Sequence, residues 1–227
     1  VSGDYYDFIQ IDPNRVGLVL GDISGKGISA ALLMASIQSS LRAQFYNGMS
    51  RHGLDMAVPF STAQVVKRLN HQLYESTSIE KYATFFYAVY DAAAHTLTYT
   101  NAGHLPPVLY RRDRIERLTS GGTVVGMFSP MEYDQATVRL EPGDVFLAFT
   151  DGLTEPENIF GEEFGEDRLL AAAARVLHSP LDKFAGDVYQ TVMEWTGSPE
   201  LQDDMTLIVA RATGGDHQPL AESPENR

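Results

Sequence analysis

The most informative absence in this sequence is that of cysteine, because none of its 227 residues is a cysteine. A chain without thiols has no cysteine nucleophile, no iron–sulfur cluster, no cysteine-based zinc site and no disulfide scaffold. Its composition fits a reducing compartment, and we predict a cytoplasmic protein. No apolar run reaches the roughly 18 residues of a membrane-spanning helix, so we expect no membrane partner.

Basic residues are also scarce. The chain has 17 lysines and arginines against 30 aspartates and glutamates, which gives a net charge of −13. Such a chain repels nucleic acid at long range, so we predict no nucleic-acid partner. The excess of acids has two interpretations. It either serves solubility alone, or it includes carboxylates that are concentrated at one place to hold cations.

The spacing of apolar residues predicts a single domain over residues 1–212. Helical periodicity is found at residues 28–47, 62–75, 167–178 and 181–195. Strands are expected after an N-terminal hairpin (4–22), at 85–91, 96–101, 108–112, 114–118, 133–140, 145–150 and 205–211. Residues 48–60 are expected to form a loop, and 213–227 a disordered tail. Antiparallel strands in blocks with paired helices between them predict an α+β fold, with helix pairs packed outside two sheets.

The N-terminal hairpin places two carboxylates in a distinctive relation. Asp4 and Asp22 each lie nine residues from Pro13, which occupies the second position of a type I turn. In an antiparallel hairpin they come opposite each other within one residue. Directly opposed carboxylates destabilise a pair of strands, and a divalent cation would compensate them. The simpler interpretation is two acids on the surface.

Glycines surround the second of these acids, in the segment Gly21-Asp22-Ile23-Ser24-Gly25-Lys26-Gly27 between a strand and a helix. Glycines let a backbone approach a ligand closely, and a helix start offers N–H groups to an anion. The segment is no P-loop, because three residues rather than four separate Gly21 from Gly25. Ser24 is not in a G-x-S-x-G frame either.

Two more acidic positions lie beside predicted strands. Asp151 directly follows an apolar strand and precedes Gly152, and Asp203-Asp204 precedes the last strand. Adjacent acids point to opposite faces, so at most one of Asp203 and Asp204 enters a shared site. A turn cap and a loop are the plainer interpretations of these two positions. Carboxylates without sulfur ligands suit Mg²⁺ or Mn²⁺.

The histidines give little sign of a metal site. No H-x-x-x-H pair occurs among them, which disfavours a zinc hydrolase. We expect His104 to be a turn or packing residue.

Six motifs in order resemble one family. They are Gly3-Asp4-Tyr5-Tyr6-Asp7, the segment from Gly21 to Gly27, Asn101-Ala102-Gly103-His104, Pro142-Gly143-Asp144, Thr150-Asp151-Gly152-Leu153-Thr154-Glu155 and Asp203-Asp204-Met205-Thr206. In this order they resemble the SpoIIE/RsbU-type branch of the metal-dependent serine/threonine protein phosphatases (PPM, protein phosphatase 2C-like). The resemblance covers about residues 1–212. It implies an α-β-β-α sandwich with two Mn²⁺ or Mg²⁺ ions between the sheets.

The resemblance also implies roles for particular residues. Asp22 would bridge both ions, and the backbone carbonyl of Ile23 would bind one of them. Asp151 and Asp203 would complete the catalytic core with Asp22. Asp4 would act mainly through metal-bound water. A water that bridges the ions would attack the phosphorus in line.

Neighbouring acids receive lesser roles from the resemblance. Asp204 stands where the family often has asparagine, and Asp7 would be structural. Eukaryotic members carry a phosphate-binding arginine upstream of the first acidic motif, which this bacterial branch generally lacks. Lys26 or the following helix start would then contact the phosphate.

The resemblance implies a partner as well. This bacterial branch acts on phosphoserine or phosphothreonine of a STAS-type anti-anti-sigma protein, in the partner switching of stress response or sporulation, under an upstream sensor domain. Because the sequence starts at Val1 directly at a motif, we expect it to be a piece of a longer protein. Two alternatives remain: a pseudophosphatase that binds a phosphoprotein without cleaving it, and a small-molecule phosphatase.

Overall fold

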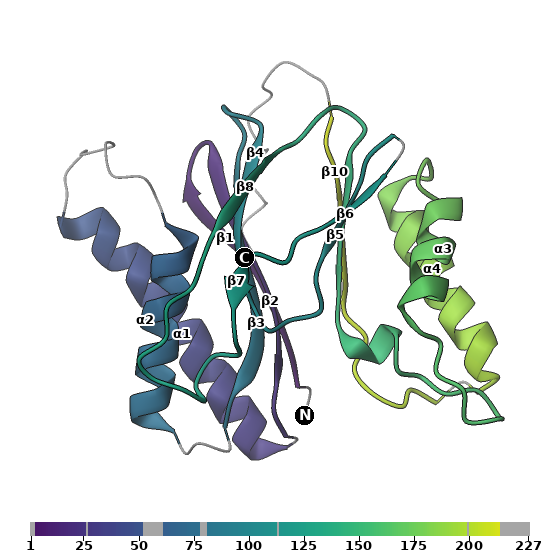
Figure 1. The fold of residues 1–227 in the computed structure, drawn as a ribbon, viewed down its shortest axis with the longest axis horizontal. Helices are drawn as coiled ribbons and strands as arrows, with labels where there is room; N and C mark the ends of the chain where they lie inside the picture. The colour runs from purple at the N-terminus through teal and green to yellow at the C-terminus, as the bar shows by residue number, and fades with distance from the viewer. Residues whose placement is uncertain are drawn as a thin grey trace, which may run out of the picture.

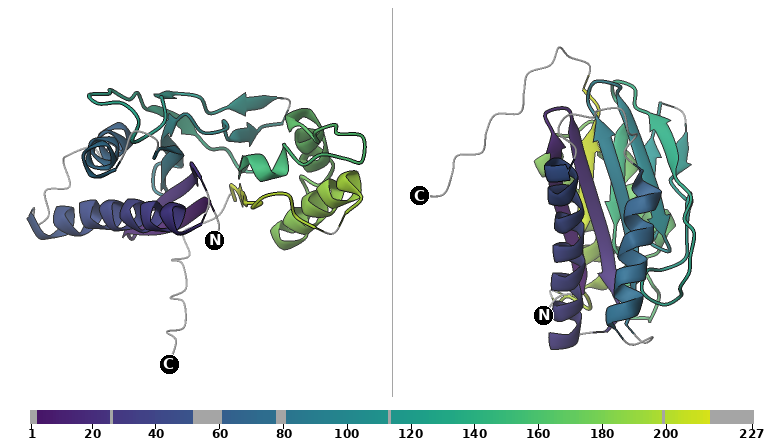
Figure 2. Two further views of the ribbon diagram at one scale, coloured as in Figure 1. Left: turned by 90° about the horizontal axis from the view of Figure 1, so that it is seen from below. Right: turned by 90° about the vertical axis from the view of Figure 1, so that its left-hand side faces the viewer.

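The computed structural model describes residues 3–25, 27–51, 61–77, 81–112, 114–198 and 200–213, without the side chains of residues 45–51. Its elements form four layers (Figure 1). Helices α1 (Ile28–Arg51) and α2 (Thr62–Ser76) lie outside one sheet, and α3 (Glu166–Arg175) and α4 (Leu181–Thr196) lie outside the other. Figure 2 shows the same layers from two further sides. The predicted α-β-β-α sandwich is confirmed.

The first sheet contains the N-terminal hairpin. Its strand order is β1-β2-β3-β4-β7, and β8 also pairs with β4. The pairings are antiparallel except for β4 with β7. The strands are β1 (Asp4–Asp12), β2 (Arg15–Ile23), β3 (Ala83–Asp91), β4 (Thr96–Ala102), β7 (Gly121–Gly122) and β8 (Ala136–Arg139).

The second sheet is smaller and antiparallel throughout, with the order β10-β9-β5-β6. Its strands are β10 (Leu207–Arg211), β9 (Val145–Phe149), β5 (Val108–Tyr110) and β6 (Ile115–Arg117). A short 3₁₀ helix, η1 (Asp151–Leu153), directly follows β9. None of the helices described here is long and apolar enough to cross a membrane.

Three apolar clusters hold the layers together: one under α1 and α2, one between the sheets and one under α3 and α4. Strand β3 shows how a single strand serves two of them. Phe85 and Tyr87 belong to the helix-side cluster, whereas Phe86 and Ala88 belong to the cluster between the sheets. Side chains alternate along a strand, so a strand covered on both faces is apolar throughout.

Some predicted boundaries were wrong. Helix α1 continues to Arg51 instead of ending at residue 47, so the expected loop at 48–60 begins later; residues 52–60 lie outside the described part. The strand predicted over 133–140 is only β8. Before it, the side-chain oxygen of Gln135 accepts hydrogen bonds at the start of α2, which takes this stretch away from the ladder. The expected disordered tail lies outside the described residues from 214 onward.

Candidate functional site

The hairpin register brings the first two acids together. Asp4 pairs directly with Asp22, as predicted. The turn fixes this register, because the Asp12 carboxylate accepts hydrogen bonds from the N–H groups of Asn14 and Arg15, both at 2.9 Å. A register shift between Gln10 and Asp12 keeps the irregularity next to the turn and away from the carboxylates.

Asp4 is held by the opposite sheet. The hydroxyls of Thr150 and Thr206 donate to its Oδ2 at 2.7 and 2.6 Å. These threonines also bond to each other, since the Thr206 N–H donates to Thr150 Oγ1 at 3.0 Å. Burial raises the pKa of Asp4, although both hydroxyls act to lower it. One carboxylate of the first sheet is therefore fixed between the ends of β9 and β10.

Asp22 is the most strongly perturbed of the four acids. Burial, followed by the negative charges of Asp151, Asp4 and Asp203, raises its pKa to about 6. Within the described ranges, no ion pair joins Asp4, Asp22 or Asp151 to a lysine or arginine. Four carboxylates thus repel one another at one place, and a cation there would relieve the repulsion.

Asp151 begins η1, where the backbone rather than the carboxylate closes the turn. Its carbonyl accepts the N–H groups of Thr154 and Glu155, both at 2.8 Å. There is therefore no need to interpret the Asp151 carboxylate as a cap of this turn. Figure 1 shows η1, the start of β1 and the segment before β10 at the same lower end of the two sheets.

The adjacent acids Asp203 and Asp204 precede β10 and lie outside any strand, so the alternation expected of them does not apply. The Gly3 N–H donates to Asp204 Oδ2 at 2.9 Å, so Asp204 anchors the start of β1. Both acids also act electrostatically, because Asp203 contributes to the raised pKa of Asp22 and Glu155, and Asp204 contributes to that of Asp4.

Gly3 has no side chain, and this leaves open a small space that is bordered by three oxygen atoms. A Cβ at this position would lie 3.1 Å from Asp22 Oδ1, 3.4 Å from the carbonyl oxygen of Ile23 and 3.9 Å from that of Gly25. One carboxylate oxygen and two carbonyl oxygens therefore border one small space, and hard oxygen donors are what Mg²⁺ and Mn²⁺ prefer. In the part of the chain that the structure describes, no three or more His, Cys, Asp or Glu side chains are close enough together, as they stand, to hold a metal ion. The donor set nevertheless fits a divalent cation.

His104 packs as expected and does not join the acids. It is 5% exposed, and burial lowers its pKa to about 4. Its Nδ1 lies 2.8 Å from Thr84 Oγ1, which accepts the Asp22 N–H at 3.3 Å. The neutral imidazole is thus linked through Thr84 to the backbone of Asp22.

Lys81 lies beside the glycine-rich segment that follows β2, although the sequence analysis did not identify it as a candidate residue. Its Nζ donates to Ser29 Oγ at 3.1 Å, in the first turn of α1, and lies 3.7 Å from where a Cβ of Gly25 would be. It precedes β3 in sequence without any motif, so only the fold brings it to the glycine-rich segment.

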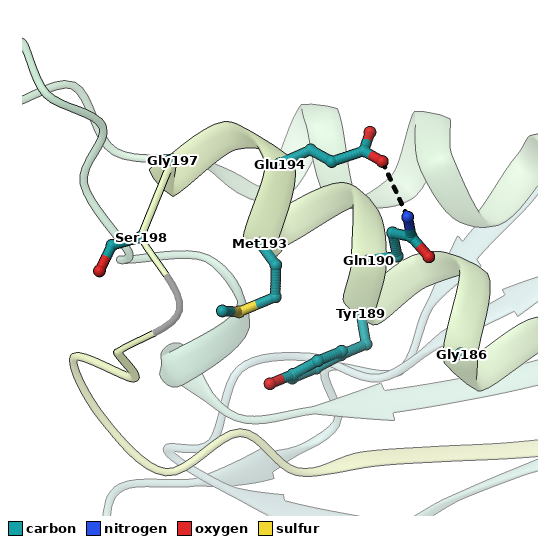
Figure 3. A pocket seen from close by; sticks show the side chains of 7 residues that line it. All are labelled: Gly186, Tyr189, Gln190, Met193, Glu194, Gly197 and Ser198. Atoms are coloured by element: carbon teal, nitrogen blue, oxygen red, sulfur yellow. Dashed lines mark hydrogen bonds between the residues drawn. The ribbon is translucent and has the colours of Figure 1, made fainter.

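A surface hollow of ≈ 440 Å³ lies elsewhere, along α4 (Figure 3). Tyr189, Gln190, Met193 and Glu194 line it, and Gln190 donates to Glu194 at 3.0 Å. None of the four carboxylates lines this hollow, so we do not connect it with their chemistry.

The metal-free protein is expected to show opposing pH effects from Asp22 and His104. Between about pH 4 and 6 the folded state keeps Asp22 protonated, whereas the unfolded state, with the ordinary pKa of 3.8, does not. Stability from this group therefore falls as the pH rises. His104 acts the other way, since only the unfolded state, with the ordinary pKa of 6.5, is protonated in this window.

Single variants separate these two effects. In EDTA, Asp22→Asn should leave only the His104 effect. Its free energy of unfolding should rise relative to that of the wild type as the pH increases from 4 to 6, by about 1 kcal/mol in total because Asp22 is partly exposed. The free energy of unfolding of His104→Gln should instead fall relative to that of the wild type as the pH increases over the same range. Urea denaturation at several pH values measures the free energy of unfolding of all three proteins. If it depends on pH identically in all three, the assignment of both pKa shifts is contradicted.

Comparison with known proteins agrees with this geometry. The family model described as "Stage II sporulation protein E (SpoIIE)" matches residues 12–213. Phosphoserine phosphatase RsbU of Bacillus subtilis is 31% identical over 215 residues, covering 93% of this chain and 59% of RsbU. Phosphoserine phosphatase RsbP of the same organism is 30% identical over 159 residues, covering 69% of this chain and 37% of RsbP. The chain thus spans only part of each relative.

Solved structures share the fold. The SiaA-PP2C domain of Pseudomonas aeruginosa superposes with a TM-score of 0.79 at 19% identity, covering 93% of this chain and 81% of that one. The PP2C phosphatase domain of SpoIIE from Bacillus subtilis, solved with a fragment of its regulatory domain, gives 0.72 at 19% identity, covering 93% and 59%. RsbX in complex with magnesium gives 0.62 at 17% identity, covering 92% and 86%.

Proposed function

Since this chain belongs to the stage II sporulation protein E (SpoIIE) family, we propose that it is a metal-dependent protein phosphatase that hydrolyses phosphoserine or phosphothreonine. The observation that carries the proposal is the convergence of Asp4, Asp22, Asp151 and Asp203, without a lysine or arginine paired to the first three among the described residues. Two of the relatives that are 30–31% identical to this chain, RsbU and RsbP, are named phosphoserine phosphatases.

We assign the metal ligands to Asp22, Asp151, Asp203 and the Ile23 carbonyl, with Asp4 acting at the edge of the site. Two Mn²⁺ or Mg²⁺ ions held there would supply Lewis acidity to the reaction. The threonine pair orients Asp4 by holding its Oδ2. Gly3 keeps the space beside Asp22 open, and Thr84 fixes the Asp22 backbone through the bond described above.

The phosphoryl group of the substrate needs positive partners in addition. We place it near the start of α1, where free N–H groups and the helix dipole favour an anion. Lys81 supplies a side-chain cation at the same helix start through its bond to Ser29. In this proposal the nucleophile is a water molecule, which metal ions held by the carboxylates would activate.

The substrate is a protein in this proposal. The names of RsbU and RsbP suggest a phosphoserine substrate, and the resemblance of the motifs implies that a STAS-type anti-anti-sigma protein carries it. The parts of RsbU and RsbP that this chain does not cover suggest a separate regulatory domain. A cysteine-free chain also fits the reducing bacterial cytoplasm as its location.

The threonine pair gives a prediction about metal binding. Thr206→Val keeps the side-chain shape but removes a donor to Asp4, so Asp4 is less well oriented. We expect the Mn²⁺ affinity to fall by roughly tenfold, as for other residues that orient metal ligands. Calorimetric titration with Mn²⁺ measures this. Thr98→Val is the control, because it removes an exposed threonine pair between β4 and β8 instead. An equal loss in both variants would contradict the role of Thr206.

The experiment that tests the function is hydrolysis of p-nitrophenyl phosphate and of a phosphoserine peptide, in Mn²⁺ and in EDTA. We expect activity in Mn²⁺ only, and a loss with Asp151→Asn. Asp182→Asn makes the same chemical change at an exposed position in the first turn of α4 and should be fully active. Full activity of Asp151→Asn would refute the assignment of Asp151 to the active site. Mn²⁺ binding without hydrolysis would favour the pseudophosphatase, and turnover of sugar phosphates but not of the peptide would favour the small-molecule phosphatase.

A further inference from the structure

Two bare hydrophobic side chains lie at the tip of the segment that follows η1. Ile159 is 81% exposed and Phe160 is 80% exposed, the highest values among the large hydrophobic residues that the structure describes. Single exposed hydrophobic residues are common on proteins. Two consecutive ones, placed almost completely in solvent on the segment that follows η1, ask for a further reason.

The tip is a hydrogen-bonded turn. The Asn158 side-chain oxygen accepts the N–H groups of Phe160 and Glu162 at 2.9 and 3.1 Å. The Asn158 N–H donates to the Glu162 carbonyl at 2.9 Å, and Gly161 completes the turn with a φ of 76°. The backbone therefore fixes the position from which Ile159 and Phe160 project.

The same segment is tied to both sides of the carboxylate cluster. Gln202, next to Asp203, clamps Glu157 twice, because it accepts the Glu157 N–H and donates to the Glu157 carbonyl, both at 2.9 Å. The Gly165 N–H donates to the Thr154 carbonyl at 2.7 Å, at the end of η1. Figure 1 shows this segment at the end of the sheets where η1 lies.

A third support comes from the far side of the segment. The Trp195 indole N–H donates to the Glu162 carbonyl at 3.1 Å. The Arg168 guanidinium lies 4.1 Å from the centroid of the Trp195 ring and donates to the Phe164 carbonyl at 3.0 Å. The tip is thus held rigidly relative to α4 as well.

The segment that carries the tip is acidic, although Arg117 pairs with Glu166 and Arg168 lies behind the segment at Trp195. Residues 154–167 include six acids and no lysine or arginine, the acids being Glu155, Glu157, Glu162, Glu163, Glu166 and Asp167. Such a surface attracts a basic partner and repels an acidic one. A second copy of this chain, with its net charge of −13, is therefore a poor occupant.

We propose that Ile159 and Phe160 form a docking tip for the protein substrate, which binds it through apolar side chains accompanied by lysine or arginine near the phosphoserine. This inference rests on the proposed phosphatase function and names the chemistry of its substrate. The tip contributes to binding and not to the chemical step, because its side chains project from the turn and not from the carboxylate cluster. Its loss therefore raises KM for such a substrate and leaves kcat in place.

The test compares the wild-type chain with Ile159→Ser/Phe160→Ser in Mn²⁺. The substrates are p-nitrophenyl phosphate and two peptides of about 20 residues, long enough when extended to pass from the cluster to the tip. One peptide carries leucine and lysine on both sides of a phosphoserine, and the other has glutamate in place of each lysine. Ile115→Ser, at a 41% exposed position on β6, is the control variant.

We expect the wild type to prefer the lysine peptide, and the double variant to lose roughly tenfold in kcat/KM for it, mainly through KM, as when hydrophobic anchors are truncated. Hydrolysis of p-nitrophenyl phosphate should be unchanged, which also shows that the variant folds. Equal KM values for the lysine peptide in the wild type and the double variant would overturn the proposed docking role of Ile159 and Phe160. Failure of the wild type to hydrolyse p-nitrophenyl phosphate would instead overturn the proposed function.

Discussion

Replacing Asp22 with asparagine is expected to reduce Mn²⁺-dependent phosphate-ester hydrolysis by on the order of a thousandfold or more. The amide keeps the size of the side chain but removes the charge at the centre of the carboxylate cluster. The same change should stabilise the metal-free protein near neutral pH by about 1 kcal/mol, because it removes a partly buried charge and its repulsion by the neighbouring acids, the two causes that raise the pKa of Asp22. Loss of activity with gain of stability is the signature of a residue kept for function.

The matched control is Asp7→Asn on the same strand. Asp7 accepts a hydrogen bond from the Arg42 guanidinium at 2.8 Å and is not among the charges that perturb Asp22. This variant should keep its activity and gain no stability. p-Nitrophenyl phosphate assays in Mn²⁺ and denaturation in EDTA give the two readouts. An active Asp22→Asn, or an equal loss in both variants, would show that the cluster is not the catalytic centre.

The substitution Gly152→Ala is expected to destabilise the protein by about 3 kcal/mol or more and to inactivate it. A Cβ at Gly152 would lie 1.8 Å from the carbonyl oxygen of Asp204 and 2.8 Å from its carbonyl carbon. No rotation of a side chain relieves a clash with backbone. The segments that carry Asp151 and Asp203 must therefore separate.

Gly186→Ala provides a control of opposite sign. Gly186 lies inside α4, and a Cβ there would meet nothing within 4 Å. Alanine is the better helix former, so this variant should gain about 0.5–1 kcal/mol and stay active. Chemical denaturation and the same hydrolysis assay compare the two. A Gly152→Ala variant with wild-type stability would mean that η1 and the segment before β10 do not pack closely together.

The sequence predicted those features of the site that depend on local chemistry. The turn residues around Pro13 set the opposition of Asp4 and Asp22, and the apolar run before Asp151 set its place at the end of β9. Local patterns carry this information because a turn and an alternation rule act over a few residues.

Features that depend on distant parts of the chain were not predictable in this way. Strand β7 consists of two glycines, which local rules assign to a turn; a Cβ at Gly121 would lie 1.8 Å from the Asn101 carbonyl oxygen, so the close pairing itself requires glycine. The bonds of Thr150 and Thr206 to Asp4, and the approach of Lys81 to Ser29, exist only once the sheets have packed.

The bonds between the two ends of the domain make site assembly a matter of timing during synthesis. The contacts of Asp4 with Thr206 and of Gly3 with Asp204 span 202 and 201 residues. A ribosome adds roughly 5–20 residues per second, so Asp22 leaves the exit tunnel about 10–40 s before Thr206 does. Until then the nascent chain lacks both the last strand and the threonine that holds Asp4. We therefore expect truncated or stalled chains to lack the proposed phosphatase activity until the last strand of the domain has been translated.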